Sequence, residues 1–208
     1  MAEVHIIGEI ECASGFPEQR LFCRWELGFG GGWRVIQGVS KGQTQIDLSE
    51  YEDFAYFSHP LDIHLVTKTI QVFCSRKLWI GRSRKISRQQ LWKKVKNLLK
   101  IFLYLGWPSI NLQIWHYDEF GRQELYGYGS IYLPASPGEH QMKCYTWRPK
   151  GSLREEMMQY FVGGGLQLSN ENSTGLDEYS RLRTVSMGVV KLRISVITKN
   201  FDRFGIQC

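Results

Sequence analysis

Most of the chain alternates apolar and polar residues, which is the pattern of strands that bury one face of a sheet. Apolar side chains occupy the even positions of residues 4–10, and one face of the next such segment carries Leu21, Cys23, Trp25 and Leu27. Further strands are predicted at residues 33–39, 43–47, 61–67, 110–115, 126–133, 139–144 and 189–197. Short strands at this spacing are typical of an antiparallel sandwich. The pattern therefore predicts an all-β fold, with residues 1–208 forming a single domain.

One short helix is predicted in this β-rich body. Residues 152–155, Ser-Leu-Arg-Glu, fit a capping box, in which the serine and the glutamate satisfy N–H groups of the first turn. Leu153, Met157 and Phe161 follow at helical spacing and predict a buried face. The glycines at 163–165 end the helix.

Residues 72–105 have a different pattern. Their apolar residues fall at helical period from residue 91 onward, at Leu91, Trp92, Val95, Leu98, Leu99, Phe102 and Leu103. The opposite face carries Lys93, Lys94, Lys96 and Lys100. The pattern predicts a basic amphipathic helix within an insertion that does not belong to the sandwich.

The net charge of +6 is concentrated in this insertion. Residues 72–105 hold ten Lys and Arg and no Asp or Glu, whereas the other 174 residues hold 16 basic and 20 acidic side chains. The body is therefore mildly acidic, and no nucleic-acid partner is expected for it. Removing the insertion would leave eight residues between the strands at 61–67 and 110–115, which is a normal connection length.

Three interpretations of the insertion remain open. Its apolar face beneath lysines fits a helix that binds a membrane surface or a calmodulin-type partner. Its charge alone favours nucleic acid. Its composition and its position inside a short loop fit an isoform-specific insert or a translated intron. Transcripts that all contain the segment would exclude the last interpretation.

The sequence predicts no catalytic residues, no metal site and no cofactor. The five cysteines show no C-x-x-C spacing, and no serine or cysteine lies in a G-x-S-x-G context, which argues against a hydrolase. The N-terminus has no basic region followed by an apolar stretch, and no run of 18 apolar residues occurs. We therefore expect a cytoplasmic protein with reduced thiols.

Residues 114–127 resemble the strand-loop-strand of a calcium-binding C2 domain, where acidic side chains ligate the metal. Asp118 and Glu124 occupy acidic positions of that pattern, but His116 stands where an Asp is needed. Because imidazole is a poor ligand for calcium, the sequence predicts a degenerate loop without calcium.

Several blocks together resemble the B9 domain family. They include residues 1–8 (MAEVHIIG), 13–16 (ASGF), 42–45 (GQTQ), 58–64 (SHPLDIH), 146–149 (TWRP), 161–165 (FVGGG) and 200–205 (NFDRFG). The resemblance covers residues 1–71 and 106–208, and residues 72–105 have no counterpart in it.

This resemblance implies a C2-like antiparallel β-sandwich with no enzymatic activity. It implies a subunit of the tectonic-like (Meckel syndrome) complex at the ciliary transition zone, which supports cilium biogenesis and forms a membrane diffusion barrier. The implied location is the cytoskeleton, the basal body and the transition zone. The implied partners are B9 domain-containing protein 1 and the Meckel syndrome type 1 protein, with tubulin or a membrane surface as further ones. The alternative is a peripheral membrane-binding C2-type module that acts through lipid contacts.

Five residues of the family blocks are candidate partner contacts, because their types are enriched at interface anchors. They are Trp147, Arg148, Phe201, Asp202 and Arg203. The alternative is that they hold the sandwich together internally, with Trp147 in the core and Asp202 paired with Arg203.

Overall fold

A computed structural model describes residues 1–49, 53–67, 106–168 and 182–201, and within them the chain forms nine strands and one helix. In chain order they are β1 (Ala2–Ser14), β2 (Leu21–Gly28), β3 (Trp33–Gly38), β4 (Lys41–Gln43), β5 (Phe54–Thr67), β6 (Ser109–Tyr117), β7 (Gln123–Tyr132), β8 (Gly138–Pro149), α2 (Leu153–Val162) and β9 (Thr184–Lys199).

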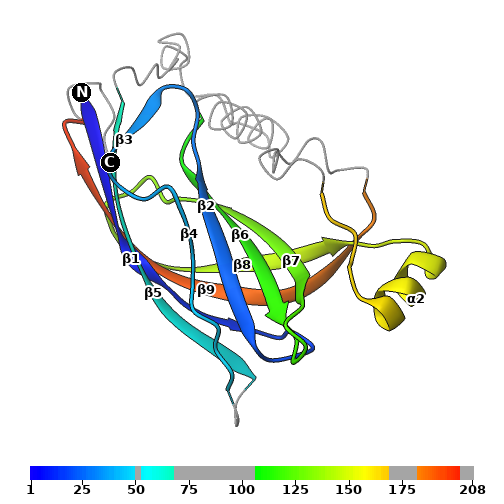
Figure 1. Ribbon diagram of the computed structural model, residues 1–208. Coiled ribbons are helices and arrows are strands. Elements are labelled where there is room, and N and C mark those ends of the chain that lie inside the picture. Colours follow the sequence, from blue (N-terminus) through cyan, green and yellow to red (C-terminus); the bar gives the residue numbers. More distant parts are fainter. Residues whose placement is uncertain (50–52, 68–105, 169–181, 202–208) are drawn as a thin grey trace, which may run out of the picture.

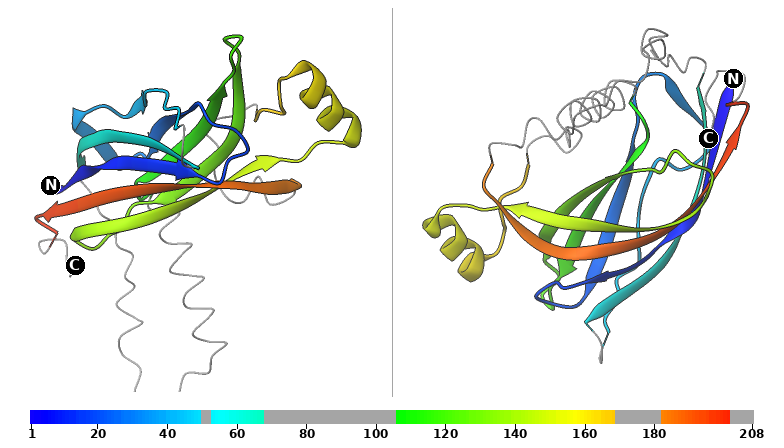
Figure 2. Two further views of the ribbon diagram at one scale, coloured as in Figure 1. Left: turned by 90° about the horizontal axis from the view of Figure 1, so that it is seen from below. Right: turned by 180° about the vertical axis from the view of Figure 1, so that it is seen from behind.

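All the strand pairs are antiparallel, and they link the strands in the order β3-β5-β1-β9-β8-β7-β6-β2-β4. The sheet folds over where β7 meets β8, which are joined by the pair Tyr128 and Trp147. Strands β3, β5, β1, β9 and β8 then face β7, β6, β2 and β4 as two layers (Figure 1). Figure 2 shows the same two layers from below. The predicted all-β antiparallel sandwich is confirmed.

The main hydrophobic core lies between the layers, and the predicted alternation places residues in it. Val4, Ile6 and Ile10 of β1 are all buried there. A bulge between Ile10 and Cys12 shifts the register, after which the odd-numbered Ala13 faces the core. One inserted residue reverses which side chains point inward, since side chains alternate along a strand.

A second, smaller cluster covers the outer face of β2, β6 and β7. Its buried members are Phe22, Trp115, Leu125 and Tyr128, with Tyr117, Trp147 and Leu168 packed against them. Phe22 is fully buried on the face opposite to Leu21 and Cys23. Alternation along β2 did not predict this cluster, because both faces of the strand are covered.

Several strands are longer than predicted, and two differ most from the sequence prediction. The strand expected at residues 43–47 is instead β4, Lys41–Gln43, followed by an isolated bridge between Leu21 and Asp47. The ladder is interrupted at Thr44, whose Oγ1 accepts a hydrogen bond from the backbone N–H of Cys23 at 2.9 Å. Strand β5 begins at Phe54, well before the predicted residue 61. Pro60 is tolerated because β3 pairs with β5 only from Ile63 onward, so Pro60 lies where β5 has an open edge.

Helix α2 forms where predicted, and its capping box is present, with Ser152 Oγ accepting from Glu155 N–H. The prediction of a buried face on this helix is wrong. Leu153, Met157 and Phe161 are all exposed. The reason is visible in Figure 1: the helix lies beyond the end of the two layers, so no sheet covers it.

Candidate functional site

The hairpin between β6 and β7 contains the loop that resembles a calcium site. Asp118 N–H donates to the Arg122 carbonyl at 2.9 Å, and Gly121 N–H donates to the Asp118 carbonyl at 3.0 Å. The Asp118 carboxylate accepts from Glu119 N–H at 2.6 Å and pairs with Arg122 Nη2 at 3.1 Å. This carboxylate therefore closes the turn through hydrogen bonds to its own loop.

His116 connects β6 to the loop between β1 and β2. Its ring is buried, with Nδ1 2.6 Å from the Gln19 carbonyl oxygen and Nε2 2.9 Å from Glu18 Oε2. The ring also stacks on Tyr126, with centroids 5.1 Å apart. By its place in the sequence, His116 stands where a calcium site needs an acidic ligand. In the structure it acts as a clamp between two segments.

Tyr126 completes this clamp. Burial raises the pKa of the Tyr126 hydroxyl, and the charges of Glu18 and Glu124 and a hydrogen bond to Glu18 raise the pKa further. The hydroxyl therefore stays protonated at neutral pH and donates to the Glu18 carboxylate. Within the described residues, no group of three or more His, Cys, Asp or Glu is placed to hold a metal ion.

A cleft of about 410 Å³ lies between this hairpin and α2. Its walls come from the loop after β1, from β6, β7, β8 and β9, and from α2. The charged residues that line it are Glu18, Asp118, Arg122, Glu124, Arg148 and Glu156. Asp118 and Glu124, which the sequence singled out, both line this cleft.

Trp147 and Arg148 are neighbours on β8. Trp147 packs against the second hydrophobic cluster, and Arg148 lines the cleft. The Trp147 ring lies 5.8 Å from Tyr128 and packs against the second hydrophobic cluster. Arg148 Nη1 donates to Gln159 Oε1 of α2 at 3.1 Å, while Nε is buried and has no hydrogen-bond partner among the described residues. Trp147 is therefore partly buried against this cluster, and its role as a partner contact stays a prediction.

Phe201 is 4% exposed and belongs to the main core, so it is not available as a surface anchor. Asp202 and Arg203 lie outside the described residues. So does the predicted basic helix with Lys93, Lys94, Lys96 and Lys100. Within the described part of the chain, no helix is long and apolar enough to cross a membrane.

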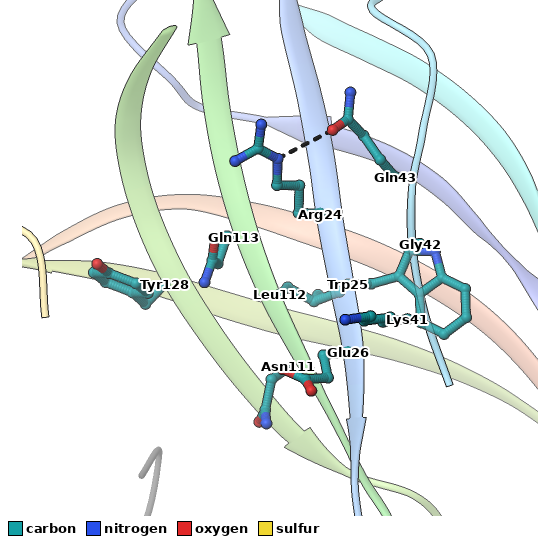
Figure 3. A pocket seen from close by; sticks show the side chains of 10 residues that line it. All are labelled: Arg24, Trp25, Glu26, Lys41, Gly42, Gln43, Asn111, Leu112, Gln113 and Tyr128. Carbon is teal, nitrogen blue, oxygen red and sulfur yellow. Dashed lines mark hydrogen bonds between the residues drawn. The ribbon is translucent and has the colours of Figure 1, made fainter. Parts of the chain in front are cut away.

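A second groove, of about 330 Å³, runs across β4, β2, β6 and β7 (Figure 3). Its arginine, Arg24, donates to Gln43 Oε1 at 3.0 Å and to Gln123 Oε1 at 2.8 Å. The guanidinium carbon also lies 4.6 Å from the centroid of the Trp115 ring. Arg24 is therefore held by two amides and a ring, which fixes the surface of the second hydrophobic cluster.

The buried thiols are poorly suited to nucleophilic chemistry. Burial raises the pKa of Cys144 to about 11 and raises the pKa values of Cys23 and Cys12 as well. Because the thiolate is the reactive form, these cysteines are unreactive at neutral pH. Burial also lowers the pKa of His59.

Comparison with known proteins confirms the family resemblance seen in the sequence. The matches run across residues 72–105, so the absence of a counterpart for that segment stays a prediction. A family model described as "Ciliary basal body-associated, B9 protein" matches residues 4–197. The chain is 43% identical over 209 residues to B9 domain-containing protein 2 of Danio rerio, covering 100% of this chain and 99% of that protein. It is 42% identical over 210 residues to B9 domain-containing protein 2 of Homo sapiens, covering 100% of both.

Among solved structures, the C2A domain of plant extended synaptotagmin 1 matches with a TM-score of 0.39 and 6% identity, covering 96% of each chain. The B9 family is not a known class of enzymes. The family match over nearly the whole chain and the identity to curated relatives lead to one conclusion. The chain belongs to the B9 domain protein family.

Proposed function

We propose that this chain is a non-enzymatic subunit of the tectonic-like (Meckel syndrome) complex at the ciliary transition zone. There it supports cilium biogenesis and the barrier to diffusion between the ciliary and plasma membranes. The observation that carries the proposal is the match to a family of ciliary basal body-associated proteins, together with full-length similarity to B9 domain-containing protein 2.

The proposed partners are other B9 domain proteins, namely B9 domain-containing protein 1 and the Meckel syndrome type 1 protein. The geometry is compatible with an assembly role. The cleft beside α2 and the groove across β4, β2, β6 and β7 are open surfaces, and helix α2 presents exposed apolar side chains. Surfaces of this kind suit docking between proteins, whereas a small-molecule site encloses most of its ligand.

The proposal is tested by co-expressing the full chain with both proposed partners and purifying through a tag on one of them. A stable ternary complex is expected. A fluorescent fusion of the chain should lie between the basal body and the ciliary shaft, and its removal should let plasma-membrane proteins enter the cilium. A chain that purifies alone, in cells whose cilia are unchanged by its loss, would contradict the proposal.

Residues 72–105 favour a second candidate function, because ten positive charges and no negative charge attract anionic lipids. In this case the chain is a peripheral membrane-binding module. Vesicles containing phosphatidylserine should bind the full chain and should not bind a version joined from Gln71 to Gly106. Salt should weaken the binding, since screening reduces the attraction between charges at the surface.

A further inference from the structure

Half of helix α2 consists of apolar residues that water reaches. Leu153, Met157, Met158, Phe161 and Val162 are between 56% and 82% exposed, and Leu166 just beyond the helix is 44% exposed. Phe120, at the tip of the neighbouring β6–β7 hairpin, is 81% exposed. Large exposed apolar patches mark interaction surfaces. We call α2 together with Phe120 the apolar surface.

Polar contacts hold α2 in place. Gln159 accepts from Arg148 of β8 at 3.1 Å, and the Val162 carbonyl accepts from Arg122 Nη1 of the hairpin at 3.5 Å. The Ser152 capping box fixes the first turn. The helix is thus positioned before any partner arrives, and its apolar side chains are exposed to solvent. Such preorganisation lowers the entropy lost on binding.

The cleft beside the apolar surface carries excess negative charge. Four carboxylates line it, those of Glu18, Asp118, Glu124 and Glu156, against the guanidinium groups of Arg122 and Arg148. Asp118 is paired with Arg122, and Glu18 is bound to His116. Among the described residues, neither Glu124 nor Glu156 forms an ion pair.

Glu124 and Glu156 are both only partly exposed, so their charge is felt strongly by a cation that enters the cleft. Glu124 also lies against the end of α2, because a Cβ atom at Gly163 would be 2.7 Å from Glu124 Oε1. Phe161 of α2 lines the same cleft as Glu124 and Glu156. An approaching segment therefore meets the carboxylates and the apolar side chains together.

These observations distinguish between occupants. Anionic lipid would bring like charge toward Glu124 and Glu156. A second copy docking through the same surface would oppose acidic clefts to each other. A helix with apolar residues on one face and Lys or Arg at its border satisfies both parts of the surface at once.

We propose that the apolar surface and the adjoining cleft form one docking site for a basic amphipathic helix of a partner protein. Its apolar side chains cover Met157, Phe161 and Phe120, and a lysine or arginine enters the cleft toward Glu124 and Glu156. This site rests on the proposed assembly role only in that the helix belongs to another subunit of the complex. Its chemistry does not depend on which subunit supplies the helix.

The test uses the full chain and a fluorescent designed peptide unrelated to this chain, an amphipathic helix with leucines on one face and four lysines at the border of that face. Fluorescence anisotropy measures binding. The variant pairs are Glu124→Gln with Glu156→Gln, and Met157→Ser with Phe161→Ser. Matched controls are Glu26→Gln, a partly exposed carboxylate in the other groove, and Val39→Ser, an exposed apolar residue far from α2. Circular dichroism confirms that each variant folds.

Each variant pair should weaken peptide binding roughly tenfold or more, while both controls bind as the unaltered chain does. A peptide with its four lysines replaced by glutamate should not bind. The proposal is overturned if the peptide fails to bind or binds all variants equally. It is also overturned if phosphatidylcholine–phosphatidylserine vesicles bind the chain and the Met157 and Phe161 pair abolishes this, which would assign the surface to lipid. Peptide anisotropy tests this site, and co-purification with B9 proteins tests the assembly role. Failure of one can therefore be distinguished from failure of the other.

Discussion

The His116 ring stacks on the Tyr126 ring, with centroids 5.1 Å apart and planes within 5° of parallel. Both side chains also contact Glu18, His116 through Nε2 at 2.9 Å and Tyr126 through its hydroxyl. One glutamate from the β1–β2 loop thus joins a residue of β6 to one of β7. The three residues of this clamp all line the cleft beside α2.

Removal of His116 should destabilise the fold. His116→Ala leaves the Gln19 carbonyl and the Glu18 carboxylate without their imidazole partner and removes the stacking on Tyr126. We expect a loss of about 2–3 kcal/mol in the free energy of unfolding, measured by urea denaturation. His140→Ala, at a histidine on β8, serves as the control and should change stability by less than about 0.5 kcal/mol.

Calcium should leave this protein unaffected. The Asp118 carboxylate is engaged by Glu119 N–H and Arg122, so it would have to break those bonds to ligate a metal. We expect the same Tm in excess calcium and in a chelator, measured by differential scanning calorimetry. A calcium-dependent rise in Tm that Asp118→Ala removes would show that the loop binds the ion.

Gly8 should resist substitution because the backbone of β9 passes directly over it. A Cβ atom there would lie 2.2 Å from the Arg193 carbonyl oxygen and 2.9 Å from Ile194 Cα, closer than atoms can approach. Gly8→Ala should therefore lower the free energy of unfolding by about 1–3 kcal/mol as β1 and β9 separate. Gly31→Ala is the matched control, because nothing lies within 4 Å of a Cβ atom there.

Trp147 should contribute to the stability of the fold through its packing. Its ring packs on the second cluster beside Tyr128, so Trp147→Ala should cost about 2–4 kcal/mol in thermal or chemical unfolding. Trp147→Phe should recover most of this loss by filling the space. If Trp147→Ala instead folds with unchanged stability and loses its B9 partners, Trp147 is a partner contact after all.

The Cys144 thiol should make stability fall at alkaline pH. Burial raises its pKa from 9.0 to about 11, so the folded state favours the protonated thiol. This contribution is fully present below pH 9 and is lost as pH rises from 9 through 11, because the unfolded state then ionises first. The difference between the unaltered chain and Cys144→Ala in urea titrations should change by about 2 kcal/mol across this range.

A thiol reagent provides a second readout for Cys144. At pH 8 the native chain should react slowly at Cys12, Cys23 and Cys144, and unfolding in urea should make all three reactive. Fast labelling of Cys144 in the native state would contradict the burial on which the pH prediction depends.

Much of the fold could be predicted from local pattern. Alternation along residues 4–10 placed Val4, Ile6 and Ile10 in the core, and the Ser152 capping box placed the start of α2. The same pattern could not show that Phe22 is buried on the other face of β2, because the side chains that cover it come from β6 and β7. It also could not show that Leu153, Met157 and Phe161 are exposed, because helical spacing says nothing about what lies opposite.

The candidate site was predicted less well, for a related reason. The sequence brought attention to Asp118, Glu124 and His116 through their spacing in one loop. Their roles depend on residues distant in sequence: Glu18 and Gln19 bind His116, and Gly163 lies against Glu124. No local signal identified Glu18 or Glu156 as members of the same cleft.

By itself the sequence determined the strand alternation, the helix cap, the family blocks and the separation of charge between residues 72–105 and the rest. These depend on neighbouring residues, whose spacing is set by backbone geometry. Tertiary structure alone decided which faces are covered, since pairing such as that between β1 and β9 joins opposite ends of the chain. An apolar helix face is buried only if the fold brings a surface against it, and at α2 the described fold leaves that face exposed.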